Sequence, residues 1–164
     1  MLSTRRIART LLVVLATGLV ALAATAAQAA TSTVPISGTF VEQQFLNQVI
    51  IPAGPTGGGT TFVTVIVGFS GSLVGTETVK ERASFQADGT LQVTHDGTFT
   101  GTIAGRSGSV QILDAGTQAP GDTLIRGSFT FVNGSGGLAG IHGQGTFTAI
   151  PGTSGTYQGE VFFN

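Results

Sequence analysis

The stretch Leu91 to Ile103, LQVTHDGTFTGTI, gives the clearest indication of secondary structure in the chain. Its residues alternate between two kinds: one set is apolar, glycine or histidine, and the other is mainly Thr, Gln and Asp. Because side chains i and i+2 share one face of a β-strand, this period of two predicts a strand with one buried face. That face would hold Leu91, Val93, His95, Gly97, Phe99, Gly101 and Ile103.

The same alternation recurs along the chain, and no stretch after residue 30 shows a sustained period of 3.6 residues. Turn-forming pairs such as Asp88-Gly89 and Pro151-Gly152 separate the segments, which favours antiparallel neighbours. The longest irregular piece, 52–60, is predicted to be a loop. We expect eight strands, at 36–45, 61–74, 76–85, 91–103, 107–114, 124–132, 141–150 and 157–163.

An all-β domain of eight antiparallel strands can close into a barrel, which removes exposed sheet edges and leaves an interior for side chains or one small ligand. We therefore predict an eight-stranded antiparallel barrel, with a two-sheet β-sandwich as the alternative. The short motif Gly-(Thr or Ser)-Phe recurs at residues 38, 97, 127 and 145, which marks equivalent positions in the barrel strands.

Glycine repeatedly shares the predicted buried face with large apolar residues, as Gly127 does with Phe129 and Gly145 with Phe147. Each glycine inside a strand costs about 0.5 to 1 kcal/mol relative to alanine, so the pattern requires a compensating advantage. Two explanations fit: the glycines let strands coil tightly around a small barrel, or they leave space inside it for a ligand.

The N-terminus has the features of a secretory signal peptide. Arg5, Arg6 and Arg9 precede an apolar run, and the tripeptide Ala27-Gln28-Ala29 fits an A-x-A cleavage site. We expect residues 1–29 to be removed, leaving one domain at 30–164 that is secreted and makes no contact with a membrane after cleavage.

Composition excludes several classes of function for residues 30–164. These residues include eight acidic and four basic side chains, which gives a net negative charge. A phosphate backbone would be repelled, so nucleic acid is not an expected partner. The chain has no cysteine, which excludes disulfides, thiolate metal sites and iron–sulfur clusters. We expect no metal and no cofactor.

A glycine-rich stretch, Gly134 to Phe147, contains a literal match to the dinucleotide fingerprint G-x-G-x-x-A. That fingerprint needs a helix after the glycine turn, and Gly140, Gly143 and Gly145 make a helix implausible here. A phosphate site is therefore rejected.

The candidate catalytic residues are acidic side chains and a histidine on predicted inward faces. Glu77 and Glu81 share a face with Val79 and Ala83, so their two carboxylates would point into the barrel. The alternative is that both carboxylates lie in solvent at the mouth of the barrel. Glu42 and His95 are the further candidates, with a hydrogen-bonded core histidine as the alternative for His95. Inward Phe99, Phe129 and Phe147, together with the phenol of Tyr157, are candidates for contact with a ligand.

The turn and strand at 133–144, NGSGGLAGIHGQ, resembles the allene oxide cyclase and dirigent barrel superfamily, whose members carry a similar glycine-rich turn before a late strand. Phe69-Ser70-Gly71, Phe99-Thr100-Gly101 and the segment 105–109, GRSGS, look more closely like an uncharacterised secreted bacterial family of the same barrel class. The superfamily resemblance implies site positions for Glu42, Gln44 and Pro52, which makes Gln44 a pocket candidate. Trimers occur in the resembling families, which leaves open a homo-oligomer, either trimer or dimer.

Three functions fit these observations. The first is a secreted barrel that binds a small apolar ligand, and the second is a cyclase or isomerase that transfers protons on a flexible hydrophobic substrate. The third is a structural extracellular protein without a pocket.

Overall fold

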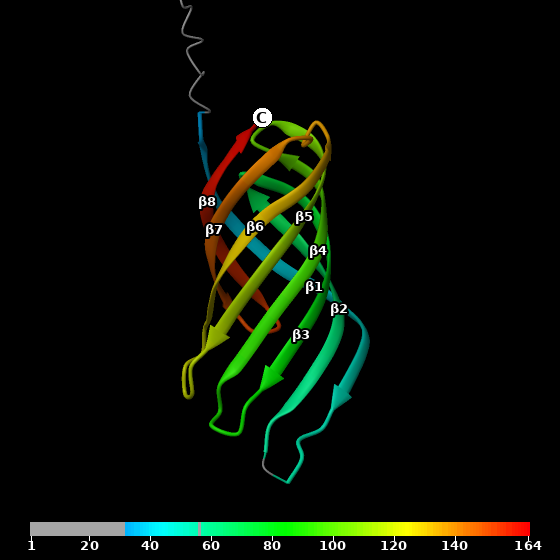
Figure 1. Ribbon diagram of the computed structural model, residues 1–164, viewed down its shortest axis with the longest axis vertical. Coiled ribbons are helices and arrows are strands. Elements are labelled where there is room, and N and C mark those ends of the chain that lie inside the picture. Colours follow the sequence, from blue (N-terminus) through cyan, green and yellow to red (C-terminus); the bar gives the residue numbers. More distant parts are fainter. Residues whose placement is uncertain (1–31, 56) are drawn as a thin grey trace, which may run out of the picture.

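Eight antiparallel strands form one closed barrel (Figure 1). The computed structural model describes residues 32–55 and 57–164. Each strand pairs with the next along the chain, and β8 returns to pair with β1, so the predicted barrel is confirmed and the two-sheet sandwich is wrong. The strands are β1 (Val34–Ile51), β2 (Gly59–Gly71), β3 (Leu73–Phe85), β4 (Leu91–Ile103), β5 (Arg106–Gln118), β6 (Ile125–Gly136), β7 (Ile141–Ile150) and β8 (Ser154–Phe163).

The two ends of the barrel differ in how they are filled. At the end that carries the β2–β3, β4–β5 and β6–β7 turns, five aliphatic side chains are almost fully buried: Leu73, Ile103, Leu138, Ile141 and Val161. Leu138 comes from the glycine-rich β6–β7 turn, which folds back so that the backbone of Gly137 donates to the Ser107 carbonyl. The glycine-rich stretch that matches the dinucleotide fingerprint is thus a turn whose Leu138 side chain closes this end of the barrel, which we call the Leu138 plug.

Inward glycines lie directly opposite inward aromatic residues on the neighbouring strand. Between β6 and β7, Gly127 pairs with Phe147 and Phe129 pairs with Gly145. A Cβ placed at either glycine would overlap the ring of its partner. The same arrangement joins β1 to β8, where Gly38 faces Tyr157 and Phe40 faces Gly155. Aromatic rings therefore fill the volume above these glycines, as in aromatic rescue of strand glycines.

The Gly-x-aromatic motif is self-complementary, because antiparallel pairing of two copies sets each glycine against the other copy's ring. Of the two explanations for inward glycine, tight closure of a small barrel accounts for these positions.

The first strand is longer and less regular than predicted. Whereas the sequence indicates a strand that ends at Phe45, β1 continues to Ile51 with register shifts between Glu42 and Gln44 and between Leu46 and Val49. A bulge adds one residue to one strand, so it reverses which later side chains face inward. Gln44 consequently pairs with outward Ile66 and is exposed, while Phe45 faces inward.

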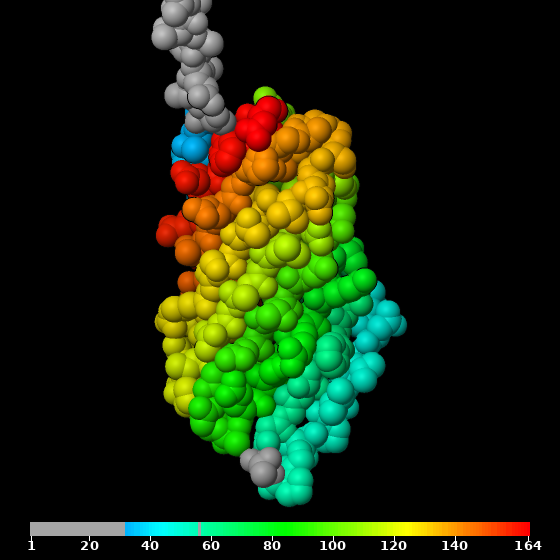
Figure 2. Space-filling model, in the orientation of Figure 1, coloured from blue at the N-terminus to red at the C-terminus, as the bar shows by residue number. Residues whose placement is uncertain are grey.

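The second half of β1 has a neighbour on one side only. Pairing with β8 ends at Val41, apart from one hydrogen bond from Glu42 N to the Thr153 carbonyl, whereas pairing with β2 continues to Ile51. The resulting hairpin projects beyond β3 and β4, as the cyan end in Figure 2 shows. Its five large apolar residues, Phe45, Leu46, Val49, Ile50 and Ile51, are each 43% to 64% exposed.

The predicted signal peptide, 1–29, lies outside the described residues. Within the described part of the chain there is no helix with the length and apolar character needed to cross a membrane.

Candidate functional site

A cavity of about 230 Å³ occupies the barrel toward the end opposite the Leu138 plug. An apolar cavity of about 150 Å³ is enough to hold benzene, so this volume accommodates a small organic molecule. Its mouth is bordered by Phe45 and Gln48 on β1, by Phe85 on β3 and by Pro151 in the β7–β8 turn. Most of its wall is apolar, formed by Val63, Val65, Val67, Val79, Val93, Ile112 and the rings of Phe40, Phe69, Phe129, Phe147 and Tyr157.

Three titratable side chains lie side by side on one level of the cavity wall. Glu81 on β3 pairs in register with His95 on β4, and His95 pairs with Asp114 on β5. The Nε2 atom of His95 lies 3.0 Å from Glu81 Oε2, and Nδ1 lies 2.8 Å from Asp114 Oδ1. The pairing of β3, β4 and β5 thus places the imidazole of His95 between two carboxylates.

This position determines the charge of His95. Burial by itself would lower the pKa of the ring, but contact with the carboxylates of Asp114 and Glu81 outweighs burial and raises the pKa to about 10. At neutral pH His95 is therefore an imidazolium ion. Its Nε2–H donates a hydrogen bond to Glu81, whereas Nδ1 forms an ion pair with Asp114 without hydrogen-bond alignment. A protonated ring has no lone pair for a metal ion. Across residues 32–55 and 57–164, no group of three or more His, Asp and Glu side chains is arranged to hold one.

Glu77 is the one polar side chain that is fully buried among the described residues, with 3% of its surface exposed. Its Oε1 atom lies against Gly97 on β4, where a Cβ would overlap it, and has no hydrogen-bond partner in the described part of the chain. Burial raises the pKa of Glu77 to about 8, and the negative charge of Asp114 acts in the same direction. The side chain is therefore mostly a neutral carboxylic acid at pH 7.

Glu42 lies on β1, two strands from Glu77 and in register with it through Val67. It is half-buried, and burial together with the charge of Glu81 raises its pKa to about 7. The cavity thus contains two acids that change protonation near neutral pH.

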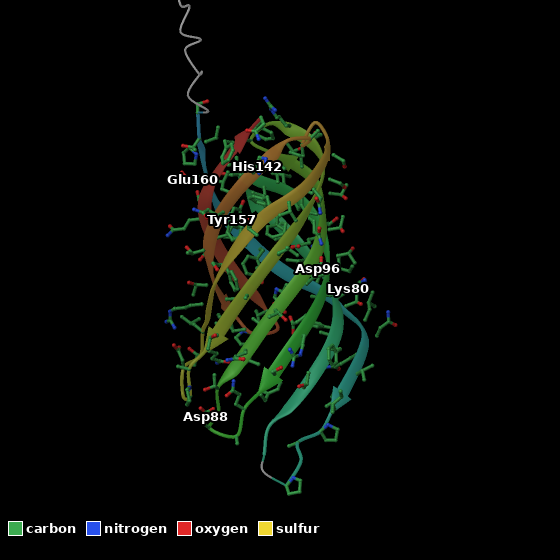
Figure 3. The ribbon with its side chains drawn as sticks, in the orientation of Figure 1. Lys80, Asp88, Asp96, His142, Tyr157 and Glu160 are labelled. Carbon is green, nitrogen blue, oxygen red and sulfur yellow. The ribbon has the colours of Figure 1, made fainter. Side chains whose placement is uncertain are left out.

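The structure brings all four predicted catalytic candidates, Glu42, Glu77, Glu81 and His95, to this one cavity. Glu77 is buried, so the alternative of a solvated mouth position does not apply to it, and Glu81 is 16% exposed. The outward side chains beside them, Lys80 and Asp96, lie on the outer surface (Figure 3).

The predicted pocket residues divide into two groups. Phe129, Phe147 and Tyr157 line the cavity, whereas Gln44 and Phe99 do not. Gln44, a pocket candidate through the superfamily resemblance, lies on the outer face because of the β1 bulge. Phe99 faces inward as predicted but is completely buried in the core, with its ring over Gly75 and Gly101.

Tyr157 has a structural role that the sequence did not indicate. Its hydroxyl accepts a hydrogen bond from Leu73 N at 2.7 Å and donates to the Ser70 carbonyl at 3.1 Å, linking β8 to the β2–β3 turn. Its ring lines the cavity, but its phenol is occupied and is not free for proton transfer.

Asp114 is the site residue that sequence reasoning missed. The predicted strand ended at this residue, whereas β5 continues to Gln118. The signal was present in the alternation of Val110, Ile112, Asp114 and Gly116, which places the carboxylate on the inward face directly opposite His95.

Comparison with known proteins supports the fold. A search of the curated proteins found no match. A crystal structure of a protein with unknown function from the DUF3224 family of Shewanella oneidensis MR-1 matches with a TM-score of 0.63 at 19% sequence identity. The match covers 81% of this chain and 98% of that chain, and at this identity it shows a shared fold.

A family model described as a protein of unknown function, DUF3224, matches residues 36–160, which run from β1 into β8. The eight-stranded barrel therefore belongs to the DUF3224 family.

Proposed function

We propose that this protein is a secreted barrel that binds a small, largely apolar molecule in the cavity between the Phe45–Phe85 mouth and the core. The observation that carries the proposal is the cavity of about 230 Å³ itself, since aromatic rings fill the space above the inward glycines and still leave this volume open. Apolar walls with a few convergent polar groups are typical of small-molecule sites.

Four of the five acidic and histidine side chains of the cavity lie on three adjacent strands, so a bound molecule would have a preferred orientation. Glu77, Glu81, His95 and Asp114 come from β3, β4 and β5, and Glu42 comes from β1. The next two strands, β6 and β7, contribute Phe129, Phe147 and Ala149 instead. An apolar body would pack on the β6–β7 side while a polar group meets the β3–β5 side.

Export through the predicted signal peptide fits this function, because a cysteine-free barrel that closes on itself needs no disulfide to be stable outside the cell. The glycine turn that resembles the allene oxide cyclase and dirigent superfamily also fits, since it closes one end of the barrel and leaves the other for a ligand.

A second candidate is proton transfer on the bound molecule, as in an isomerase or cyclase. The observation that favours it is the pair of carboxyl groups whose pKa values burial raises to about 7 for Glu42 and about 8 for Glu77. An acid with a pKa near the working pH serves well as a general acid or base. Deuterium uptake from solvent into carbon positions of the bound molecule would support this activity, and its absence would leave binding alone.

The binding function is tested by filling the cavity. Ala83 lines it and is 6% exposed, so an Ala83→Phe substitution would place a ring in the open volume. Titration with benzyl alcohol, followed by NMR, is expected to show saturable binding to the wild-type protein and at least roughly tenfold weaker binding to the variant.

The matched control is Ala115→Phe, because Ala115 lies on the outer face of β5 and adds the same ring away from the cavity. Binding that is lost in Ala83→Phe and retained in Ala115→Phe supports the proposal. Equal binding to both variants would place the ligand elsewhere and reject it.

A further inference from the structure

The titratable side chains that line the cavity include more acidic groups than basic ones. Four carboxyl groups and one imidazole face it, and its lining contains no lysine or arginine. The carboxyl groups are those of Glu42, Glu77, Glu81 and Asp114. His95 lies between two of them, Glu81 and Asp114, so one positive charge is shared by two carboxylates. The remaining two carboxyl groups, those of Glu42 and Glu77, form no ion pair with a cation among residues 32–55 and 57–164.

Of these two carboxyl groups, that of Glu77 says more about the ligand. Its side chain is 3% exposed, borders the cavity, and has an Oε1 atom without a hydrogen-bond partner in the described part of the chain. Burying a carboxyl group without a partner is costly, so in a functional site the missing partner is expected to come from the ligand. The absence of a side chain at Gly97 makes room for this oxygen.

Aromatic rings form the other side of the cavity. Phe40, Phe69 and Phe147 form a chain of ring contacts with centroid separations of 5.8 and 6.4 Å, and Phe129 faces the cavity beside them. The faces of aromatic rings attract cations, and carboxylates form strong charge-assisted hydrogen bonds with ammonium groups.

We propose that the ligand is a small apolar amine whose ammonium group pairs with Glu77 while its apolar body packs against the phenylalanine rings. This inference rests on the proposed binding function and names the chemical class of the ligand. Glu42, two strands from Glu77 in the same register row, adds negative charge that favours the same cation.

Pairing of the ammonium group with Glu77 changes the protonation of this side chain. The neutral acid of Glu77 loses its proton to solvent when the ammonium ion binds, and the resulting carboxylate and ammonium remain as an ion pair. Burial raises the pKa of Glu77 to about 8, so at pH 7 the acid is mostly protonated before binding, and close to one proton is released for each amine bound. Binding therefore tightens as the pH rises from 6 to 8.

Other titratable groups surround Glu77. Glu42, Glu81, His95 and Asp114 face the same cavity, Tyr157 lines it from β8, and the charge of outward Asp96 also acts on Glu77. Across the described residues β2, β6 and β7 contribute only uncharged side chains to the cavity lining. The proton released below pH 8 is thus assigned to Glu77, with a smaller share from Glu42, whose pKa burial raises to about 7.

Calorimetric titration at pH 7 with benzylamine and with benzyl alcohol tests the inference, because the two probes have the same ring and differ in charge. We expect benzylamine to bind roughly tenfold or more tightly than the alcohol. Repeating the titration in two buffers of different ionisation enthalpy is expected to show release of about one proton.

The variant Glu77→Gln keeps the size of the side chain and removes its ability to carry charge. It should remove most of the amine preference and leave only the small proton release assigned to Glu42. Glu160→Gln is the matched control, because Glu160 is exposed on the outer face of β8 (Figure 3) and should leave both unchanged. Melting temperatures of the two variants confirm that each is folded.

Equal affinity for the two probes, or an amine preference that is undiminished in Glu77→Gln, would overturn the inference and leave the binding function intact. Failure of both probes to bind would reject the proposed function as well.

Discussion

Glu77 and Gly97 act as one unit at the scale of single residues. The carboxyl group lies in the space that a side chain at position 97 would occupy, and every larger residue there would displace it. A buried carboxyl group is expensive to keep, and the apolar surroundings hold it in the neutral form. The structure therefore retains a proton at this point of the cavity wall.

The pH dependence of stability tests this arrangement. The pKa of Glu77 rises from 4.5 to about 8 on folding, so the folded state binds more protons than the unfolded chain between these values. The free energy of unfolding should therefore fall as the pH rises through this window, by on the order of 1 kcal/mol per pH unit. Urea unfolding between pH 5 and 6.5 is the measurement.

This range lies below the window of His95, whose stabilising contribution is present below pH 6.5 and is lost as the pH rises toward about 10. Glu77→Gln cannot titrate, so its unfolding free energy should vary less with pH between 5 and 6.5 than that of the wild type. The control Glu160→Gln should follow the wild type. Identical slopes in Glu77→Gln and the wild type would show that Glu77 does not hold its proton on folding.

Much of the site could be predicted at this scale, because strand alternation is regular where pairing is regular. Glu77, Glu81 and His95 face inward in β3 and β4 as the sequence indicates, since the pairing of these two strands contains no register shift. Gln44 was misplaced because the bulge before it is not encoded by any residue pattern that the alternation could show. The His95–Asp114 contact depends on the register of β4 against β5, which alternation within one strand does not specify.

At the scale of elements, paired Gly-x-aromatic motifs close the barrel. β6 and β7 set Gly127 and Phe129 against Phe147 and Gly145, and the ring on each strand covers the glycine on the other. This pairing defines the register, because a slip of one residue would turn the ring of the slipped strand to the outer face and leave the opposite glycine uncovered. The motif was recognised in the sequence as a marker of equivalent positions, but the partner of each copy became visible only in the sheet.

Substitution of a paired glycine tests this role. A Cβ at Gly145 would overlap the ring of Phe129 and the carbonyl of Gln158, so Gly145→Ala should lower the free energy of unfolding by about 1 to 3 kcal/mol. Gly54→Ala is the control, because no atom lies within 4 Å of a Cβ at that position. Chemical denaturation of both variants is the measurement, and equal stability would show that the glycine–ring pairs do not hold the barrel closed.

The second half of β1 is the part of the fold that the sequence pattern predicts least well. Polar Gln43, Gln44, Asn47 and Gln48 interrupt its alternation, so the strand was predicted to end at Phe45. The structure continues it because β2 supplies a partner as far as Thr60, with bulges that absorb the irregular residues. This extension brings Phe45 and Gln48 to the mouth of the cavity.

At the scale of the whole molecule, the barrel divides into a stable end and an open end. The chain's plug, built from Leu138 and its neighbours, fills one end with aliphatic side chains, while the titratable groups gather toward the other. The loss of the β8 partner beyond Val41 opens the wall where Glu42 and Phe45 border the cavity. Packing at one end thus supports a cavity at the other, which is the basis of the proposed binding function.

Native mass spectrometry of the protein recovered from the culture medium shows whether the barrel holds a small molecule. We expect the wild-type barrel to carry one small molecule, with a chain mass that corresponds to removal of residues 1–29, and the spectrum also reports any dimer or trimer. The Ala83→Phe barrel should be recovered without that molecule, and Ala115→Phe should retain it. A wild-type barrel that carries no molecule and takes up no added benzylamine or benzyl alcohol, or an Ala83→Phe barrel that keeps its ligand, would contradict the account.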